Sequence, residues 1–431
     1  MAASILASRD EPTLVPRSRG AQPSHQSLRG LDWFIFCLAD VQVGFGAFVA
    51  VYLTTQKWTQ VDIGLVLTLG GLVALAGQIP GGALVDATSR IRLLVAAAVG
   101  AIAISALAIG LFPIFPVVLA AIVAHGAASC ILGPSIAAIT LGLVGYAGIG
   151  KRLGRNASLA AIGAGLAAAG MGAFGYLLSA QAVFFVTATL CIPMLVALSR
   201  IRPEEIDHQR AHGGTARPHP GDPAATFRSL VRNQTLVTFA CCMVLFHLAN
   251  AAMLPTLAGV LTMRSSEGAT ALIGACMVVP QVFVALFSPW VGRQARSWGH
   301  QPLLLLGFAA LPIRGVLFAT VSDPYILVLV QMLDGVSAAT LGVMVPLIIA
   351  DASRGTGHFS LAQGFVGSAI GIGASLSTTM AGYVSDHFGS ATTFLTLAGI
   401  ATAGFAFVVA MGAQRTASTS SPQTSFSNRR P

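Results

Sequence analysis

The long apolar stretches of this chain, and the charge of the segments between them, most constrain its fold. The run from Leu93 to Gly150 contains no Asp, Glu, Lys or Arg, which is enough for two membrane crossings of roughly 20 residues each. Of the 24 Lys and Arg residues, 21 lie in the two tails or in alternate connecting segments. Because cytoplasmic loops are the ones enriched in Lys and Arg, both termini are predicted to be cytoplasmic and the number of spans even.

Composition supports a multi-pass protein of the plasma (inner) membrane. Hydrophobic residues make up 55% of the chain and charged residues 9%, and the mean hydropathy is +0.78, unlike the balance of a soluble domain. The net charge of +9 follows from the basic loops, so it indicates attraction to membrane lipid and no nucleic-acid partner. The six cysteines all fall within predicted spans and are interpreted as reduced packing residues. No cleavable signal peptide is expected.

The hydropathy pattern predicts an all-α integral membrane protein with twelve transmembrane helices in two six-helix bundles. The expected organisation is a cytoplasmic tail (1–30), a first bundle (31–199), a cytoplasmic linker (200–232), a second bundle (233–413) and a disordered tail (414–431). The helices are predicted at 31–54, 61–86, 91–112, 116–145, 157–179, 182–199, 233–260, 269–291, 301–320, 325–350, 358–384 and 390–413.

The two halves resemble each other at a nearly constant spacing. Ile63-Gly64, Gly82 and Leu93-Leu94 recur 210 residues later as Ile273-Gly274, Gly292 and Leu303-Leu304. His125-Gly126 recurs 209 residues later as Asp334-Gly335. Six helices per half give both halves the same orientation, which is a parallel repeat with its solute site expected between the halves near mid-membrane.

Residues 82–92 read GALVDATSRIR and resemble the G-x-L-x-D-R-x-G-R-K/R loop of the major facilitator superfamily. Ala87 and Ser89 depart from that pattern, and the second-half counterpart keeps Gly292 and Gly299 but has Arg296 in place of the Asp. With twelve spans and a mid-chain linker, the resemblance covers nearly the whole chain. It implies secondary transport by alternating access, with no identified subfamily.

The same loop is a candidate cytoplasmic gate formed by Gly82, Asp86, Arg90 and Arg92. Asp86 ends a helix, where basic residues and the N-terminal dipole of a neighbouring helix can stabilise its charge. A contact of this kind that exists in only one packing state would bias alternating access. The alternative is a carboxylate that simply lies at the water interface.

Ionisable groups inside predicted spans are costly and are therefore functional candidates. Asp40 and Asp334 are the candidate proton-coupling residues, because buried carboxylates can exchange protons near neutral pH. The resemblance implies that the first, fourth, seventh and tenth helices line the central cavity, and Asp40, His125, His247 and Asp334 fall one on each. Structural hydrogen bonds between helices are the alternative for each residue.

The remaining candidates are polar residues that could bind substrate and one arginine within a predicted span. Substrate binding is predicted for His125, His247, Asn250, Gln331, Gln78, Gln281 and Gln363. For the glutamines, packing between helices is the alternative. Arg314 lies mid-span in the ninth helix, so it must turn inward and pair, and Asp334 is the nearest partner in sequence. If Arg314 instead reached the cavity, the solute would be an anion.

Two signatures of drug–proton antiporters of that superfamily are missing. Ile122 stands at the position of their fourth-helix Arg, and the glycine-rich fifth helix has no proline, which weakens a drug-efflux assignment. Metal binding by Cys37, Asp40, Cys242 and His247 is disfavoured, because Cys241-Cys242 and His247 are not spaced to share one helix face cleanly.

We therefore expect a proton-coupled secondary transporter of a small organic solute, with efflux by antiport favoured and a monomer as the working unit. Anion uptake or uniport using Arg314 is the alternative within transport, and a non-transporting membrane sensor is the alternative outside it. No phosphate-binding loop, catalytic domain or activated nucleophile is recognised in the sequence, so neither enzyme activity nor a cofactor is expected.

Overall fold

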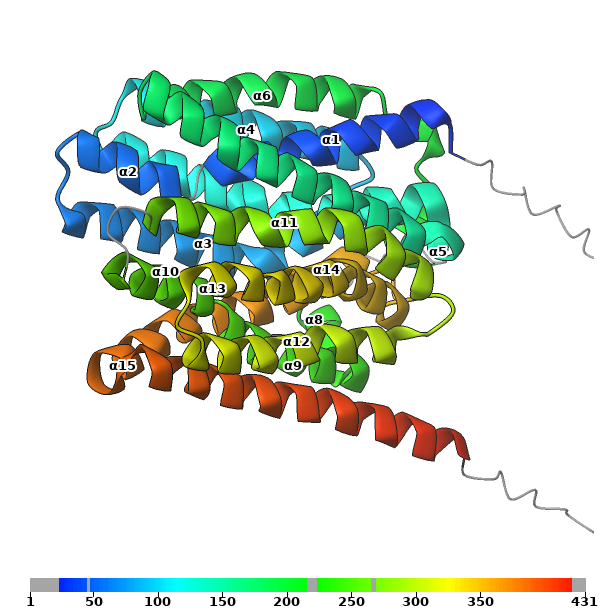
Figure 1. Ribbon diagram of the computed structural model, residues 1–431. Helices are drawn as coiled ribbons and strands as arrows, with labels where there is room; N and C mark the ends of the chain where they lie inside the picture. Colours follow the sequence, from blue (N-terminus) through cyan, green and yellow to red (C-terminus); the bar gives the residue numbers. More distant parts are fainter. Residues whose placement is uncertain (1–22, 45–46, 215–222, 265–268, 421–431) are drawn as a thin grey trace, which may run out of the picture.

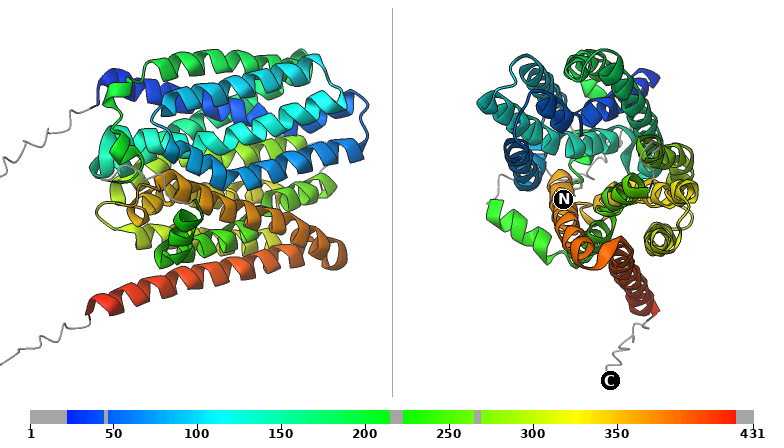
Figure 2. Two further views of the ribbon diagram at one scale, coloured as in Figure 1. Left: turned by 180° about the vertical axis from the view of Figure 1, so that it is seen from behind. Right: turned by 60° about the vertical axis from the view of Figure 1, so that its left-hand side comes forward.

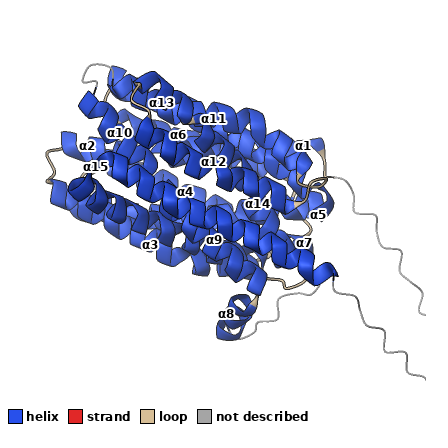
Figure 3. Ribbon diagram, turned by 60° about the horizontal axis from the view of Figure 1, so that its bottom comes forward, coloured by secondary structure: helices blue, strands red, loops and turns tan. Residues whose placement is uncertain are grey.

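A computed structural model describes residues 23–44, 47–214, 223–264 and 269–420. Every regular element within these residues is a helix, as the view coloured by secondary structure shows (Figure 3). The elements of the first half are α1 (His25–Gly44), α2 (Ala47–Thr55), α3 (Gln60–Ala87), α4 (Ile91–Leu111), α5 (Phe115–Leu177) and α6 (Ala182–Ser199).

The second half follows a short helical connection of η1 (Pro203–Glu205), α7 (His208–Ala211) and α8 (Pro223–Arg232). Its elements are α9 (Gln234–Asn250), α10 (Met253–Arg264), α11 (Ala269–Gln294), α12 (His300–Thr320), α13 (Pro324–Val330), α14 (Met332–Ala352) and α15 (Phe359–Ser420).

These elements make the twelve predicted passes, although their number differs from twelve. α5 and α15 each contain two passes, because the backbone reverses at Gly145 (φ 64°) and at Gly389 (φ 83°). Both glycines adopt left-handed backbone angles that a side chain would disfavour. Conversely, α1 with α2, α9 with α10, and α13 with α14 each form one interrupted pass. Nine helices within the described residues are long and apolar enough to span a membrane.

The passes form two bundles that lie side by side (Figures 1 and 2). In Figure 1 the first half occupies the upper part and the second half the lower part. The halves meet mainly where α3 packs on α15 and α5 packs on α11. Large apolar side chains such as Leu72, Ile104 and Leu286 are exposed, as expected of a surface that faces lipid.

The end of the bundle that contains Asp86 is called the Asp86 end below. The start of α1 and the end of α15 also lie there (Figure 1). The reversal at Gly145 is next to Arg210 of the connection between the halves. At the opposite end the indole of Trp58 donates to the carbonyl of Pro113 over 3.1 Å, which joins the turns after α2 and α4.

Two segments are more ordered at the Asp86 end than their polar sequences indicate. The fifth pass begins directly after Gly145, so Lys151, Arg152 and Arg155 lie within a helix instead of a loop. The first part of the connection packs against the bundle, with Ile201, Ile206 and Ala211 at 0 to 4% exposure. Residues 215–222 and 421–431 lie outside the described residues.

Candidate functional site

A cavity of about 390 Å³ lies between the two halves. Its wall comes from α1, α3 and both passes of α5 on one side, and from α14 and α15 on the other. Most of the lining is apolar or glycine, and the described residues that line it include no charged side chain. The lining residues are Ile35, Leu38, Ala39, Gln78, Gly133, Pro134, Ile136, Ala137, Leu153, Asn156, Ala157, Ala160, Gly342, Val345, Pro346, Gln363, Gly367 and Ile370.

Three carboxamides supply the polar contacts of this cavity: Gln78 on α3, Asn156 on α5 and Gln363 on α15. Asn156 is 7% exposed, and its Nδ2 donates to the hydroxyl of Thr140 over 3.1 Å. Its Oδ1 and the Nε2 of Gln363 are buried without a hydrogen-bond partner. Unpaired buried polar atoms cost free energy, so a hydrogen-bond partner for either atom would be favourable.

The Asp86 end of this cavity is closed by hydrogen bonds between the halves. Asp86 is 5% exposed, and its carboxylate accepts hydrogen bonds from the backbone N–H groups of Ser360 (3.0 Å) and Leu361 (2.8 Å). These donors belong to the first turn of α15, where the helix dipole also favours a negative charge. Gln363 follows one turn later, so the closure lies directly against the cavity.

Glycines allow the halves to approach this closely in two equivalent places. A Cβ at Gly82 would collide with the carbonyl oxygen of Ser360, and a Cβ at Gly292 would collide with that of Gly150. Gly82 on α3 thus packs against α15, and Gly292 on α11 packs against α5. Because the two glycines are 210 residues apart in equivalent positions, the internal repeat produces the same contact twice.

The connection between the halves reinforces the closure. Nδ1 of His212 lies 3.4 Å from Oδ1 of Asp86, and the backbone carbonyl of His212 accepts from the N–H of Phe359 over 3.1 Å. Gly213 accepts from the N–H of Gly355 over 2.5 Å. The connection is therefore attached to both halves at the point where they meet.

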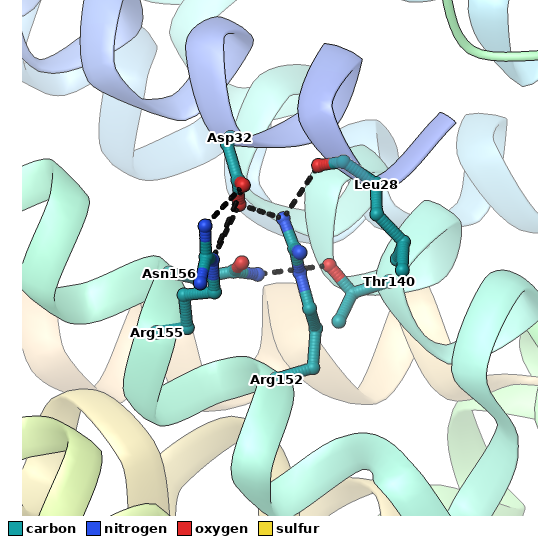
Figure 4. Close-up of polar contacts among 6 residues, drawn as sticks. All are labelled: Leu28, Asp32, Thr140, Arg152, Arg155 and Asn156. Atoms are coloured by element: carbon teal, nitrogen blue, oxygen red, sulfur yellow. Dashed lines mark hydrogen bonds and ion pairs between the residues drawn. The ribbon is translucent and has the colours of Figure 1, made fainter. Parts of the chain in front are cut away.

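A charged network lies in the first half near the Asp86 end (Figure 4). Asp32 on α1 accepts from Nη2 of Arg152 over 2.7 Å and from Nη2 of Arg155 over 2.7 Å, both on α5. Arg152, which is 6% exposed, also donates to the carbonyl of Leu28 over 3.4 Å. Burying Arg152 without Asp32 would be very unfavourable. The network fixes the turn that precedes Asn156.

A second charged group lies inside the second half. Arg314 on α12 is 2% exposed and forms an ion pair with Asp334 on α14. It also donates to Oδ1 of Asn250, the last residue of α9. Both partners lie beside helix interruptions, one between α9 and α10 and the other between α13 and α14. The pairing of Arg314 with Asp334 is confirmed, and neither residue is among those that line the cavity.

Of the other predicted residues, some line the cavity and others do not. Gln78 and Gln363 line it, whereas His125, His247, Gln281 and Gln331 are not among its lining residues. His125 contacts Ser129 over 3.4 Å within α5, and Gln331 donates to the carbonyl of Cys276 over 3.4 Å. The side chain of Asp40 lies outside the described residues.

Of the four predicted gate residues, two lie between the halves and two do not. Gly82 and Asp86 contact α15, as described above. Arg90 and Arg92 line a separate pocket between α4 and α6, where Nη2 of Arg92 donates to the carbonyl of Ser199 over 3.3 Å.

Sequence reasoning missed Asn156, His212 and the network of Asp32 with its two arginines. A buried amide one turn after Arg152 could have been found if the fifth helix had been extended back to Gly145. His212 offered no such signal, because its segment has the composition of a linker.

Among the described residues, no group of three or more His, Cys, Asp or Glu side chains could hold a metal ion.

Comparisons with known proteins agree with this architecture. The sequence matches the Major Facilitator Superfamily over residues 33–322 and 241–429. It is 39% identical over 391 residues to an uncharacterized MFS-type transporter of Mycobacterium tuberculosis, which covers 89% of this chain and 92% of that protein. It is also 25% identical over 122 residues, 28% of this chain and 30% of the relative, to the class B tetracycline resistance protein of Escherichia coli.

Solved structures of this superfamily show the same fold at low sequence identity. The E. coli fucose–proton symporter superposes with a TM-score of 0.69 at 15% identity, covering 89% of this chain and 97% of the symporter. The human organic anion transporter TETRAN gives a TM-score of 0.65 at 14% identity, covering 89% and 98%. With the family matched over most of its length and a relative 39% identical, this chain belongs to the Major Facilitator Superfamily of membrane transporters.

Proposed function

We propose that this protein carries a small organic solute across the plasma membrane by proton-coupled alternating access, in the direction of export. The observation that carries the proposal is the cavity between the halves, which is sealed at one end by Asp86 and lined by three amides. A cavity at the interface of two repeats is where such transporters bind their solute.

The proposed gate is the contact between Asp86 and the first turn of α15. The basic residues at the Asp86 end support a cytoplasmic position for this end, with both termini inside. When the halves rock apart there, the carboxylate loses its two backbone donors and His212, and the cavity opens toward the cytoplasm. Hydrogen bonds to a charged group contribute roughly 1.5–3 kcal/mol each, which is enough to favour one state strongly yet reversibly.

For the coupling proton we propose two carboxylates, Asp334 and Asp40. Asp334 on α14 forms an ion pair with Arg314 on α12. Protonation would remove this counter-charge from a buried guanidinium that also contacts Asn250 at the end of α9. Because both contacts lie beside interrupted helices, a proton at Asp334 would change the packing of two passes together.

The lining of the cavity favours a solute that bears uncharged hydrogen-bonding groups. Asn156 offers an unpaired acceptor and Gln363 an unpaired donor, and a volume of 390 Å³ falls within the range of small-molecule sites. Anion transport by Arg314 is less favoured, because its guanidinium is already held by Asp334 and Asn250.

Export is favoured over import by the partial similarity to a tetracycline resistance protein, since removal of a toxic compound is one route to resistance. A non-transporting sensor built on the same fold is the competing class. Measured flux of any solute would exclude it.

The test is proton movement in proteoliposomes that contain the purified protein and a lumenal pH dye. Neutral, cationic and anionic organic solutes are added in turn. We expect a pH change driven by a neutral or weakly charged polar solute, with loss of that change in Asp334→Asn or Asp40→Asn. Solute flux that persists without proton movement in the unaltered protein would contradict proton coupling.

An Asp62→Asn variant is the matched control. Asp62 lies at the exposed start of α3, where it contacts Thr59, and it should couple normally. Equal loss of coupling in the control would mean that removing any carboxylate has the effect.

A further inference from the structure

A groove with a volume of about 780 Å³ lies on the outer surface between α1 and α6. It lies at the Asp86 end, where α1 begins and α6 ends. Its floor is the contact between the two helices, where a Cβ at Gly30 would lie 2.8 Å from the carbonyl oxygen of Ala197.

The walls of the groove are apolar and open to the surroundings. Trp33 on α1 is 62% exposed, and Ile192 and Val196 on α6 are 63% and 51% exposed. Ile192 and Val196 are spaced by one helical turn and form a continuous stripe along α6. Surfaces this apolar at the depth of one membrane leaflet are covered by acyl chains.

Two arginines lie at the end of the groove where α1 begins and α6 ends. Arg29 follows the same face of α1 as Trp33, and Arg200 continues the stripe of Ile192 and Val196 on α6, each spaced by four residues. Both side chains are exposed. Neither forms an ion pair within the described part of the chain.

Two of the three nearest carboxylates in sequence are engaged elsewhere, and the third, Glu204, is exposed and forms no ion pair with either arginine among the described residues. Asp32 is held by Arg152 and Arg155. Glu205 accepts from Ser24 and pairs with Arg202 over 3.7 Å. Neither arginine has an ion-pair partner among the described residues, and both lie at the end of an apolar groove beside the polar side chains of His25 and Gln26.

We infer that this groove binds one anionic phospholipid of the leaflet at the Asp86 end. Its phosphate would lie between the guanidinium groups of Arg29 and Arg200, which can each donate two parallel hydrogen bonds to phosphate oxygens. Its acyl chains would lie along Trp33, Ile192 and Val196. Basic pockets between membrane helices recognise anionic headgroups in this way, and a neutral headgroup would leave both arginines without a counter-charge.

The test uses Trp33 as a reporter in the full-length protein. Of the four tryptophans, Trp58, Trp290 and Trp298 are replaced by Phe, and the protein is placed in vesicles of phosphatidylcholine. Phosphatidylglycerol or phosphatidylcholine with brominated acyl chains, which quench indole fluorescence on contact, is then titrated. We expect phosphatidylglycerol to quench Trp33 at a mole fraction on the order of tenfold lower than phosphatidylcholine.

Substitution of the arginines decides whether the preference comes from this groove. In Arg29→Gln/Arg200→Gln the two lipids should quench equally. The control Arg293→Gln/Arg296→Gln removes two exposed charges from the Asp86 end of the second half and should keep the preference. Equal quenching in the parent protein, or equal loss of preference in the control, would overturn the inference.

Soluble sn-glycerol phosphate, added to the parent protein, distinguishes a lipid from free phosphate. Unchanged quenching supports a phospholipid site, whereas displacement of the brominated lipid by the soluble headgroup would overturn it. If the paired arginine variant does not fold, the single variants Arg29→Lys and Arg200→Lys replace it. Each keeps its charge but loses bidentate binding, and an unreduced preference in both would also contradict the inference.

Discussion

Asp86 and His212 are 126 residues apart in sequence, yet Oδ1 of Asp86 lies 3.4 Å from Nδ1 of His212 where the two halves meet. The same carboxylate accepts two backbone N–H groups at the start of α15. The connection between the halves is therefore a component of the closure and does more than join two bundles.

This arrangement predicts that His212→Ala weakens the closed state. The variant removes the imidazole but leaves both backbone donors of Asp86. The increase in the open population should therefore be smaller than in Asp86→Ala, which loses all three contacts. Hydrogen bonds to charged groups contribute roughly 1.5–3 kcal/mol each. Distances between spin labels on the Asp86 ends of α3 and α15 would measure the open population. An opening in His212→Ala as large as that in Asp86→Ala would contradict this order.

Gly82, where the two halves meet, predicts a steric effect on the same equilibrium. Gly82→Ala places a methyl group against the carbonyl oxygen of Ser360, so the Asp86 end should no longer close and net transport should fall sharply. Gly64→Ala is the matched control, since nothing lies within 4 Å of a Cβ at that position on the same helix. The same spin-label distances and solute flux are measured in both. Normal closure in Gly82→Ala would contradict this prediction, because it would show that the methyl group is accommodated at the contact with α15.

The network around Asp32 predicts a loss of stability without any direct contact to solute. Asp32→Asn leaves Arg152 buried without a counter-charge, and breaking a buried ion pair costs about 3 kcal/mol or more. The thermal unfolding temperature in detergent should therefore fall well below that of the control Asp62→Asn. Adding Arg152→Gln to Asp32→Asn should recover part of the loss, because the uncompensated charge is then removed. A further decrease in the double variant would contradict the ion-pair explanation.

Much of this architecture could be predicted from local sequence, because membrane passes and close glycine contacts leave local signals. Gly82, Asp86 and Gly292 were recognised from a motif and a repeat, and all three lie where the two halves meet. What could not be predicted depends on partners far apart in the chain. The charge of Arg152 lowers the local hydropathy, so the hydropathy pattern predicts a loop there, and its partner Asp32 is 120 residues away.

The start of the connection predicts a pH dependence of stability. Burial alone would raise the pKa of Glu205, but hydrogen bonds from Ser24 and Ser27 and the charge of Arg202 bring it below its usual value. A lowered pKa stabilises the fold at pH values above the pKa of the unfolded chain, and this contribution is lost as the pH falls through the lowered pKa. Glu205→Gln should therefore reduce the unfolding temperature near neutral pH but not in acid. Glu204→Gln, at an exposed neighbour, should show no such pH-dependent difference.

The amides of the cavity predict a change in solute binding that is separate from folding. Asn156→Ala removes an unpaired acceptor and Gln363→Ala an unpaired donor, both from residues that line the cavity. Each should raise the solute concentration for half-maximal transport about tenfold, which corresponds to one lost hydrogen bond of roughly 1.4 kcal/mol. Thr140→Val is the control, because it removes the partner of Asn156 while leaving the amide in the cavity, and its effect should be smaller. Flux measured over a range of concentrations separates a change in binding from a change in maximal rate. If both alanine variants lowered only the maximal rate, these amides would act on the conformational change and the solute would bind elsewhere.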